Sequence, residues 1–248
     1  MKRQGCRIRL GVFLGVFLVR VAAGWADTAQ KYLDRAHTDV KQGNLPQAIA
    51  DFTKALELDP QDAEAYYNRG LTYDHQGNFA QAIADYTKAI ELKPHLAPAY
   101  DNRGAAYDHQ GDFAHAISDY TKALELNPQY AEAYYNRGLT YDHQGNFAQA
   151  IADCTKALEL NPQSPDAYAV RGTAYTQQGN LSQAIADCTK ALELDPHLAQ
   201  AYASRGAAYF VIKEYDKAWA DVHKAAALGL AVDPDFLTAL KKASGRDH

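Results

Sequence analysis

The sequence AEAYYNRGLTYDHQGNFAQAIADYTKAIELKPHL, residues 63–96, recurs almost unchanged at residues 131–164. The two copies differ at five positions: Tyr86/Cys154, Ile90/Leu158, Lys93/Asn161, His95/Gln163 and Leu96/Ser164. The same 34-residue period continues in both directions without an insertion and defines six blocks: 29–62, 63–96, 97–130, 131–164, 165–198 and 199–232. A fixed period of this kind predicts an array of similar structural units, each packed on its neighbours.

Each block is predicted to hold two helices. In the first half of block 63–96, small or apolar residues lie at Ala63, Tyr66, Gly70 and Tyr73, which is the spacing of one helical face. The second half of the block repeats this pattern. Hydrophobic residues make up 47% of the chain, and many of them are Ala, which favours packed helices over a sheet.

Three residues mark the ends of these helices. Gly77 follows the first helix and is suited to the left-handed conformation that ends one. Asn78 is placed to cap the second helix, and Pro94 would stop it. The first and second helix of each block are therefore predicted to be antiparallel neighbours joined by a tight turn.

The pattern of small and large residues resembles the tetratricopeptide repeat. Counted from the start of each block, positions 8, 20 and 27 are small, positions 4, 11 and 24 are larger, and position 32 is Pro; in block 63–96 these are Gly70, Ala82, Ala89, Tyr66, Tyr73, Tyr86 and Pro94. The resemblance covers 204 of the 248 residues. It implies an all-α fold, a right-handed superhelical solenoid of antiparallel helix pairs whose first helices line the concave face. It implies no particular ligand.

The ends of the array depart from the pattern, as terminal repeats do. The sixth block has Lys213 in place of the turn glycine. Residues 233–243 are predicted to form a short capping helix with Phe236, Leu237 and Leu240 on one side, followed by a disordered tail at 244–248.

The N-terminus has the layout of a secretory signal peptide at residues 1–26. Four basic residues precede a ten-residue apolar run, and Gly24-Trp25-Ala26 places small residues as a cleavage site requires. The run is shorter than the about 20 residues that a stable membrane span needs. The six repeats would then occupy 27–232 of an exported protein, in the periplasm or cell envelope. Arg20 leaves open the alternative of a cytoplasmic chain or one tethered by an uncleaved signal.

The net charge indicates which partners to expect, and the cysteine positions indicate whether to expect a disulfide. Cleavage would remove five of the 25 basic residues and none of the 30 acidic ones, leaving a net charge of −10. Such a chain is not expected to bind nucleic acid. Cys154 and Cys188 hold the same position in adjacent blocks, about one packing distance apart, which favours core packing over a disulfide.

Position 7 is Arg and position 23 is Asp in every block. The pairs are Arg35/Asp51, Arg69/Asp85, Arg103/Asp119, Arg137/Asp153, Arg171/Asp187 and Arg205/Asp221. Either the arginines form an anion-binding ladder, or each pairs with its Asp across two helices. The matched frequency favours the second interpretation, because an unpaired cation in a packed seam is costly.

No pattern in the sequence indicates catalysis or a cofactor. There is no nucleophile with its own base, no phosphate-binding glycine loop and no HExxH. Asp-His pairs recur at 74–75, 108–109 and 142–143, and these residue types bind zinc. Their even spacing favours a surface stripe over a metal site, so we expect no metal, no cofactor and no enzyme.

The resemblance also implies a binding surface, because ligands of tetratricopeptide proteins lie on positions 2, 5, 6, 9, 12 and 13 of the first helix. The candidate residues are Tyr67, Asn68, Leu71, Asp74, His75, Asp101, Asn102, Asp108, His109, Tyr135, Asn136, Leu139, Asp142 and His143. The lysines with which one subclass grips a C-terminal carboxylate are missing at position 5. The row Asp74, Asp108 and Asp142 instead favours a basic or polar ligand.

These observations predict a non-catalytic scaffold that binds a protein or a peptide through the groove of first helices. The alternative is a structural or assembly role through self-association of the solenoid. A third interpretation is that the groove side chains bind nothing and are solvated residues that duplication left in place.

Overall fold

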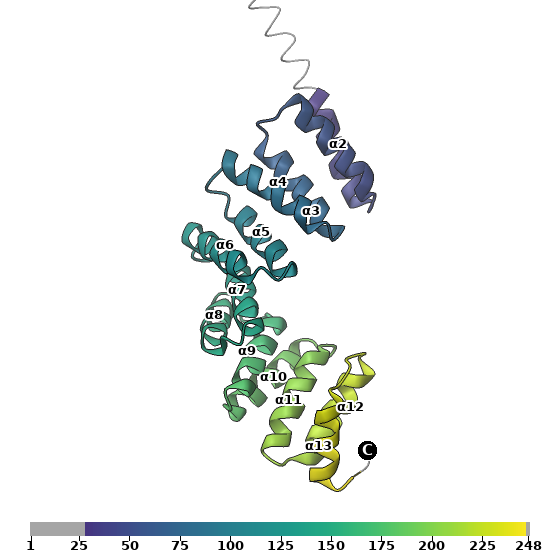
Figure 1. Ribbon diagram of the computed structural model, residues 1–248, viewed down its shortest axis with the longest axis vertical. Coiled ribbons are helices and arrows are strands. Elements are labelled where there is room, and N and C mark those ends of the chain that lie inside the picture. The colour runs from purple at the N-terminus through teal and green to yellow at the C-terminus, as the bar shows by residue number, and fades with distance from the viewer. Residues whose placement is uncertain (1–27, 247–248) are drawn as a thin grey trace, which may run out of the picture. The chain divides into compact units, whose positions relative to one another are not determined.

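A computed structural model describes residues 28–246, and all regular structure within that range is helical (Figure 1). Residues 28–41 form the first helix of the first repeat. The helices that follow are α2 (Leu45–Leu58), α3 (Ala63–His75), α4 (Phe79–Leu92), α5 (Ala97–His109), α6 (Phe113–Leu126), α7 (Ala131–His143), α8 (Phe147–Leu160), α9 (Pro165–Gln177), α10 (Leu181–Leu194), α11 (Ala199–Val211), α12 (Tyr215–Ala227) and α13 (Pro234–Ser244). The predicted signal peptide lies outside the described residues.

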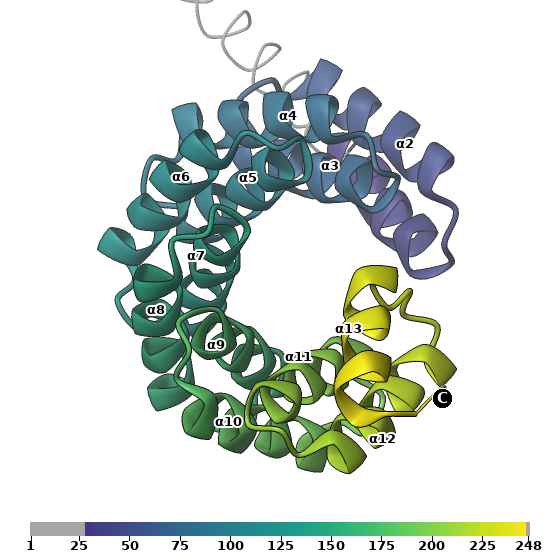
Figure 2. The same ribbon diagram turned by 60° about the horizontal axis from the view of Figure 1, so that its bottom comes forward.

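The chain divides into two compact units, one ending at Gly111 and one beginning at Asp112. Within the second unit, α7, α9 and α11 form an inner layer, and α8 and α10 form an outer layer (Figure 2). In the first unit α3 and α5 likewise line one side, with α2 and α4 on the other. This confirms the predicted all-α solenoid of antiparallel pairs. Between residues 28 and 246, no helix combines the length and the apolarity that crossing a bilayer requires.

The turn between the helices of a pair depends on one backbone conformation. Gly77 has a φ of +75°, in the left-handed region where only glycine is unstrained. In the sixth repeat Lys213 adopts this conformation, with a φ of 65°. The prediction that Asn78 caps the next helix is wrong, because its side chain makes no capping hydrogen bond. Its amide donates instead to Gln76 Oε1 at 3.0 Å.

Glycine at position 8 brings the two helices of a pair into close contact. A Cβ added to Gly70 would lie 2.8 Å from the Tyr86 ring, and one added to Gly138 would lie 2.9 Å from Cys154 Sγ. Both distances are shorter than an ordinary van der Waals contact, so an alanine at either position would force the core apart. The side chain at position 24 therefore occupies the space that glycine leaves.

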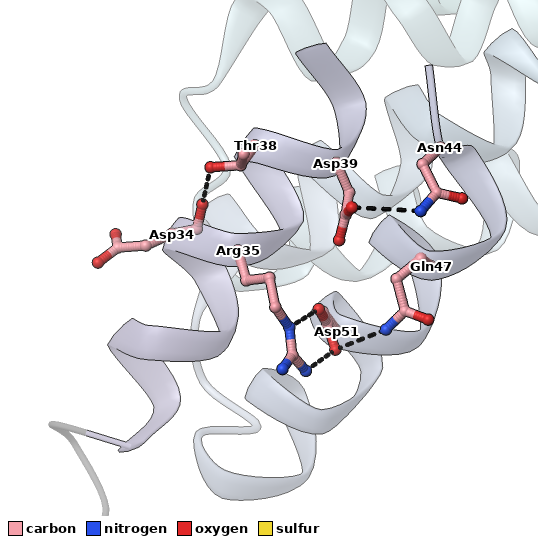
Figure 3. Close-up of polar contacts among 7 residues, drawn as sticks. All are labelled: Asp34, Arg35, Thr38, Asp39, Asn44, Gln47 and Asp51. Carbon is pink, nitrogen blue, oxygen red and sulfur yellow. Dashed lines mark hydrogen bonds and ion pairs between the residues drawn. The ribbon is translucent and has the colours of Figure 1, made fainter. Parts of the chain in front are cut away.

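The Arg–Asp pairs are structural. Figure 3 shows Arg35 and Asp51 pointing toward one another from residues 28–41 and α2, with Gln47 Nε2 donating to the same carboxylate at 3.3 Å. In the second repeat, Arg69 Nε and Nη2 each donate to Asp85 at 2.7 Å.

A third bond ties each inner repeat to the one before it. Arg69 Nη1 donates to Thr53 Oγ1 of the preceding repeat at 3.0 Å, and Arg137 does the same to Thr121 at 2.9 Å. Arg35 belongs to the first of the six repeats, and its side chain is 53% exposed, against 16% for Arg69. Because the guanidinium groups are committed to these contacts, they do not form an anion-binding ladder.

The two described cysteines are buried and free. Burial raises the pKa of the Cys154 thiol and of the Cys188 thiol to about 12. Cys188 Sγ lies 2.6 Å from the place where a Cβ on Gly172 would lie. Both thiols therefore fill the core beside a position-8 glycine, as predicted.

The C-terminal helix differs slightly from its prediction. Helix α13 extends through Ser244, and Trp219 Nε1 donates to the Ser244 hydroxyl at 3.1 Å. Arg246 forms an ion pair with Asp216 at 2.6 Å. The predicted disordered tail is thus wrong for residues 244–246, because contacts with α12 hold them in place. Leu240 is fully buried against Trp219.

Candidate peptide-binding surface

A cavity of about 400 Å³ lies on the layer of first helices in the second unit. Three successive repeats line it, through α7, α9 and the start of α11. Four of the predicted surface residues take part: Tyr135, Leu139, Asp142 and His143. The structure therefore brings together, around one hollow, residues that the sequence predicted as a stripe.

The walls of this cavity combine apolar and acidic side chains. Leu139, Val170 and Leu198 supply apolar surface, while Asp142 and Asp166 supply carboxylates. No Lys or Arg lines the cavity. We conclude that its electrostatic potential favours a cationic group over an anionic one.

Asp142 is the most unusual residue of this cavity. It is half-buried, and its Oδ1 atom is buried without a hydrogen-bond partner among residues 28–246. Burial raises the pKa of Asp142, and the neighbouring His143 opposes this. Because Asp142 lines the cavity, its carboxylate is placed to accept a hydrogen bond from a donor that enters from outside.

Tyr135 lines a second hollow of about 470 Å³ together with Glu132 and Asn161. Burial, and then the charge of Asp166, raise the pKa of the Tyr135 phenol to about 12. Tyr135 and Asp166 border both hollows. They are therefore placed to contact a ligand that runs from one hollow to the other.

In the first unit, the tyrosine equivalent to Tyr135 contacts its neighbours. The Tyr67 ring lies against Tyr86, with centroids 5.9 Å apart, and its hydroxyl accepts a hydrogen bond from Asn102 Nδ2 at 2.9 Å. The hollow found in this unit measures about 110 Å³ and is lined in part by Asn68, Leu71 and His75. Tyr67 and Asn102 thus brace neighbouring repeats against each other.

Two of the predicted histidines contact an aromatic ring of the preceding repeat. His109 stacks on Phe79 of the preceding repeat at a centroid distance of 4.6 Å and an angle of 11°. His143 lies 6.1 Å from Phe113, tilted by 48°. All three predicted histidines are exposed, as a surface stripe requires. Among residues 28–246 no three His, Cys, Asp or Glu side chains form a group that could hold a metal ion.

The remaining predicted residues are less accessible than expected. Asp101 is only 1% exposed, so its assignment to the surface is wrong. A short side chain at position 5 stays below the surface, as Ala169 does at 6%, whereas a tyrosine reaches out of it. Asp74, Asp108 and Asn136 are half-buried.

Sequence reasoning missed part of the surface. Asp166, Val170, Thr173, Leu198 and Gln200 come from the fifth repeat and the start of the sixth. The signal was present, because Asp166 and Val170 occupy positions 2 and 6 of the family's binding surface. The prediction named position-6 residues only in earlier repeats and named no residue at position 2.

Stacked helix pairs of equal length with an open layer of first helices define a class, the helical repeat scaffolds. Family models described as tetratricopeptide repeat match residues 33–97, 131–164 and 165–198, and one described as TPR repeat matches 109–145. The chain belongs to the tetratricopeptide repeat family.

Solved structures agree with this assignment. A MamA protein is 32% identical, with a TM-score of 0.63, and the match covers 70% of this chain and 95% of that one. YrrB, described as a TPR protein with an unusual peptide-binding site, is 27% identical with a TM-score of 0.62, covering 78% and 97%. A tetratricopeptide repeat protein from Parabacteroides merdae, at 24% identity and a TM-score of 0.72, covers 88% of both chains and supports the fold alone. No curated protein matches the sequence.

Proposed function

We propose that this protein is a non-catalytic scaffold that binds a protein or a peptide on its layer of first helices. The observation that carries the proposal is the cavity of about 400 Å³ bordered by α7, α9 and α11, since it joins three repeats into one concave site. Apolar walls with a few polar groups are typical of ligand sites. The likeness to YrrB, whose description names a peptide-binding site, adds support.

An extended peptide is the ligand that suits this surface best. The two hollows that share Tyr135 would receive successive side chains of such a peptide. Tyrosine offers a large contact area and loses little conformational freedom on binding. A globular partner would present the same kind of segment in a loop or at a terminus.

Selection from a random peptide display library on the immobilised full chain tests the proposal. We expect enrichment of a common motif, and we expect resynthesised peptides to bind in fluorescence anisotropy. Leu139→Asp, which places a charge in the apolar wall, should weaken binding at least about tenfold, as the loss of a buried apolar anchor does. Lys156→Ala on the outer helix α8 is the matched control and should bind normally.

Two results would refute the proposal. One is that the selection enriches no motif. The other is that the Leu139→Asp variant, with an unchanged circular dichroism spectrum, binds as well as the unchanged chain. Light scattering on the same sample separates binding from self-association, because the proposed scaffold stays monomeric as its concentration rises.

We further propose that the protein acts in the cell envelope after export. Support comes from the basic and apolar pattern of residues 1–26. Mass spectrometry of the protein isolated from envelope extract should find a chain beginning at Asp27. A chain that retains residues 1–26 would contradict cleavage, and recovery in the cytoplasmic fraction alone would contradict export.

A further inference from the structure

The second unit offers an acidic cavity in whose lining His143 is the one basic side chain. Asp142 and Asp166 line the cavity, while no Lys or Arg does. The arginines of these repeats are unable to serve, because they are engaged elsewhere: Arg137 pairs with Asp153, and Arg171 pairs with Asp187. Apart from His143, the lining supplies no basic side chain, so a lysine or arginine at this cavity would have to come from another molecule.

One oxygen of the Asp142 carboxylate lacks a donor. Its Oδ1 atom is buried and makes no hydrogen bond among the described residues. In the Arg–Asp pairs of the same unit, by contrast, each carboxylate oxygen accepts a bond of 2.6–2.9 Å. The Arg–Asp pairs are thus satisfied, whereas Asp142, like Asp74 and Asp39, keeps one buried oxygen without a partner among the described residues.

The apolar walls match the stem of a long basic side chain. Leu139, Val170 and Leu198 surround the cavity, and the Tyr135 ring lies at its border. Lysine and arginine bury their methylene stems against such surfaces while the charged end reaches a polar group. A tyrosine ring also attracts a cation that lies over its face.

We propose that this cavity binds a lysine or arginine side chain of the peptide ligand, with its charged end at Asp142. The inference rests on the proposed function, which it sharpens by naming the chemistry of the ligand. Asp166 stands nearer solvent and would attract the cation as it approaches. An acidic or purely apolar segment would leave the Asp142 carboxylate without a partner.

The second repeat supplies a matched control. Asp74 is the equivalent of Asp142, is half-buried, and also has a buried Oδ1 without a partner. The adjacent Tyr67, however, is bonded to Asn102, and neither Tyr67 nor Asp74 lines the hollow of about 110 Å³ in that unit. An Asp74→Asn change therefore removes the same group without touching the proposed site.

The probe is the peptide acetyl-Ala-Ala-Arg-Ala-Ala-amide, added in millimolar amounts to the isotope-labelled full chain and followed by NMR. We expect saturable shifts of amides in α7 and α9, weakened by high salt. A peptide with citrulline, which keeps the shape of arginine without its charge, should bind about tenfold more weakly, as should Asp142→Asn with the arginine peptide. Asp74→Asn should bind within about twofold of the unchanged chain.

Each opposite result overturns the inference. Equal binding of the citrulline peptide, an unaffected Asp142→Asn variant with a native spectrum, or shifts confined to α3 and α5 would exclude a cation at this cavity. Library selection separates the two proposals. Enriched peptides that lack Lys and Arg and ignore Asp142→Asn would remove the inference and leave the scaffold function intact, whereas no enrichment would remove both.

Discussion

The repeats 63–96 and 131–164 differ at five positions, yet their surfaces differ in kind. In the first, Tyr67 is fixed by the Tyr86 ring and by Asn102 of the next repeat. In the second, the same tyrosine is Tyr135, which lines two hollows. Cys154 stands in place of Tyr86, and Val170 stands in place of Asn102.

The comparison shows how identical helices can have different surroundings. The first helix is identical in both repeats, from its first alanine to its last histidine. The differences come from the helix behind it and from the neighbouring repeat. A scaffold built by duplication can thus open or close a site without altering the residues that line its face.

The largest expected effect concerns position 24. Tyr86 is fully buried and packs against Gly70, so Tyr86→Ala should lower the free energy of unfolding by about 3–5 kcal/mol, as truncation of a buried aromatic residue does. Cys154→Ala removes one small group and should cost about 1 kcal/mol. Urea unfolding followed by circular dichroism measures both. Equal losses would show that the two repeats do not differ in the way described.

The second effect should be the same in both repeats. Asp85 and Asp153 accept two bonds each from Arg69 and Arg137, at 2.7–2.8 Å. Asp85→Ala and Asp153→Ala should each cost about 2–3 kcal/mol, because the guanidinium loses its partner in a mostly buried seam. A difference of more than about 1 kcal/mol between them would contradict an equivalent structural role.

The smallest effect depends on pH. Burial raises the pKa of Asp74 and of Asp142 above the ordinary 3.8. The folded chain therefore holds these protons more tightly than the unfolded chain does. The contribution of the two aspartates to the free energy of unfolding is greatest below their ordinary pKa and falls as the pH rises through the raised pKa. Asparagine does not ionise, so each Asp→Asn change should be more favourable at pH 7 than at pH 3.5.

The two aspartates should respond in the same direction. Burial is the largest cause of the raised pKa at both, and neighbouring histidines oppose it. Both Asp→Asn changes should therefore give a gain that grows with pH. Urea midpoints at the two pH values give the answer, and a gain independent of pH would refute the assignment of buried, proton-retaining carboxylates.

Much of the fold could be predicted from the sequence, because its determinants lie within one repeat. Gly77 sets a turn, Gly70 sets a helix contact, and Arg69 with Asp85 closes a pair, all within 34 residues. The prediction that Asn78 caps a helix was wrong for a local reason, because its side-chain amide donates a hydrogen bond to Gln76 instead.

The candidate site was less predictable, because it depends on neighbours beyond the repeat. Asp101 and Tyr67 share position 5, but only the longer side chain reaches the surface. Whether Tyr135 borders an open hollow depends on residues such as Val170 in the next repeat. The position of a residue in the repeat predicted the direction of its side chain. Whether that side chain borders an open hollow depended on the lengths of side chains on several neighbouring helices.

The most direct test of the scaffold function compares the two tyrosines. Peptides selected on the full chain should bind Tyr135→Ala at least about tenfold more weakly, as expected for a central aromatic contact, whereas Tyr67→Ala should stay within about twofold. Fluorescence anisotropy with both folded variants provides the measurement. Unchanged binding by Tyr135→Ala, or a greater loss with Tyr67→Ala, would contradict a ligand site on the second unit.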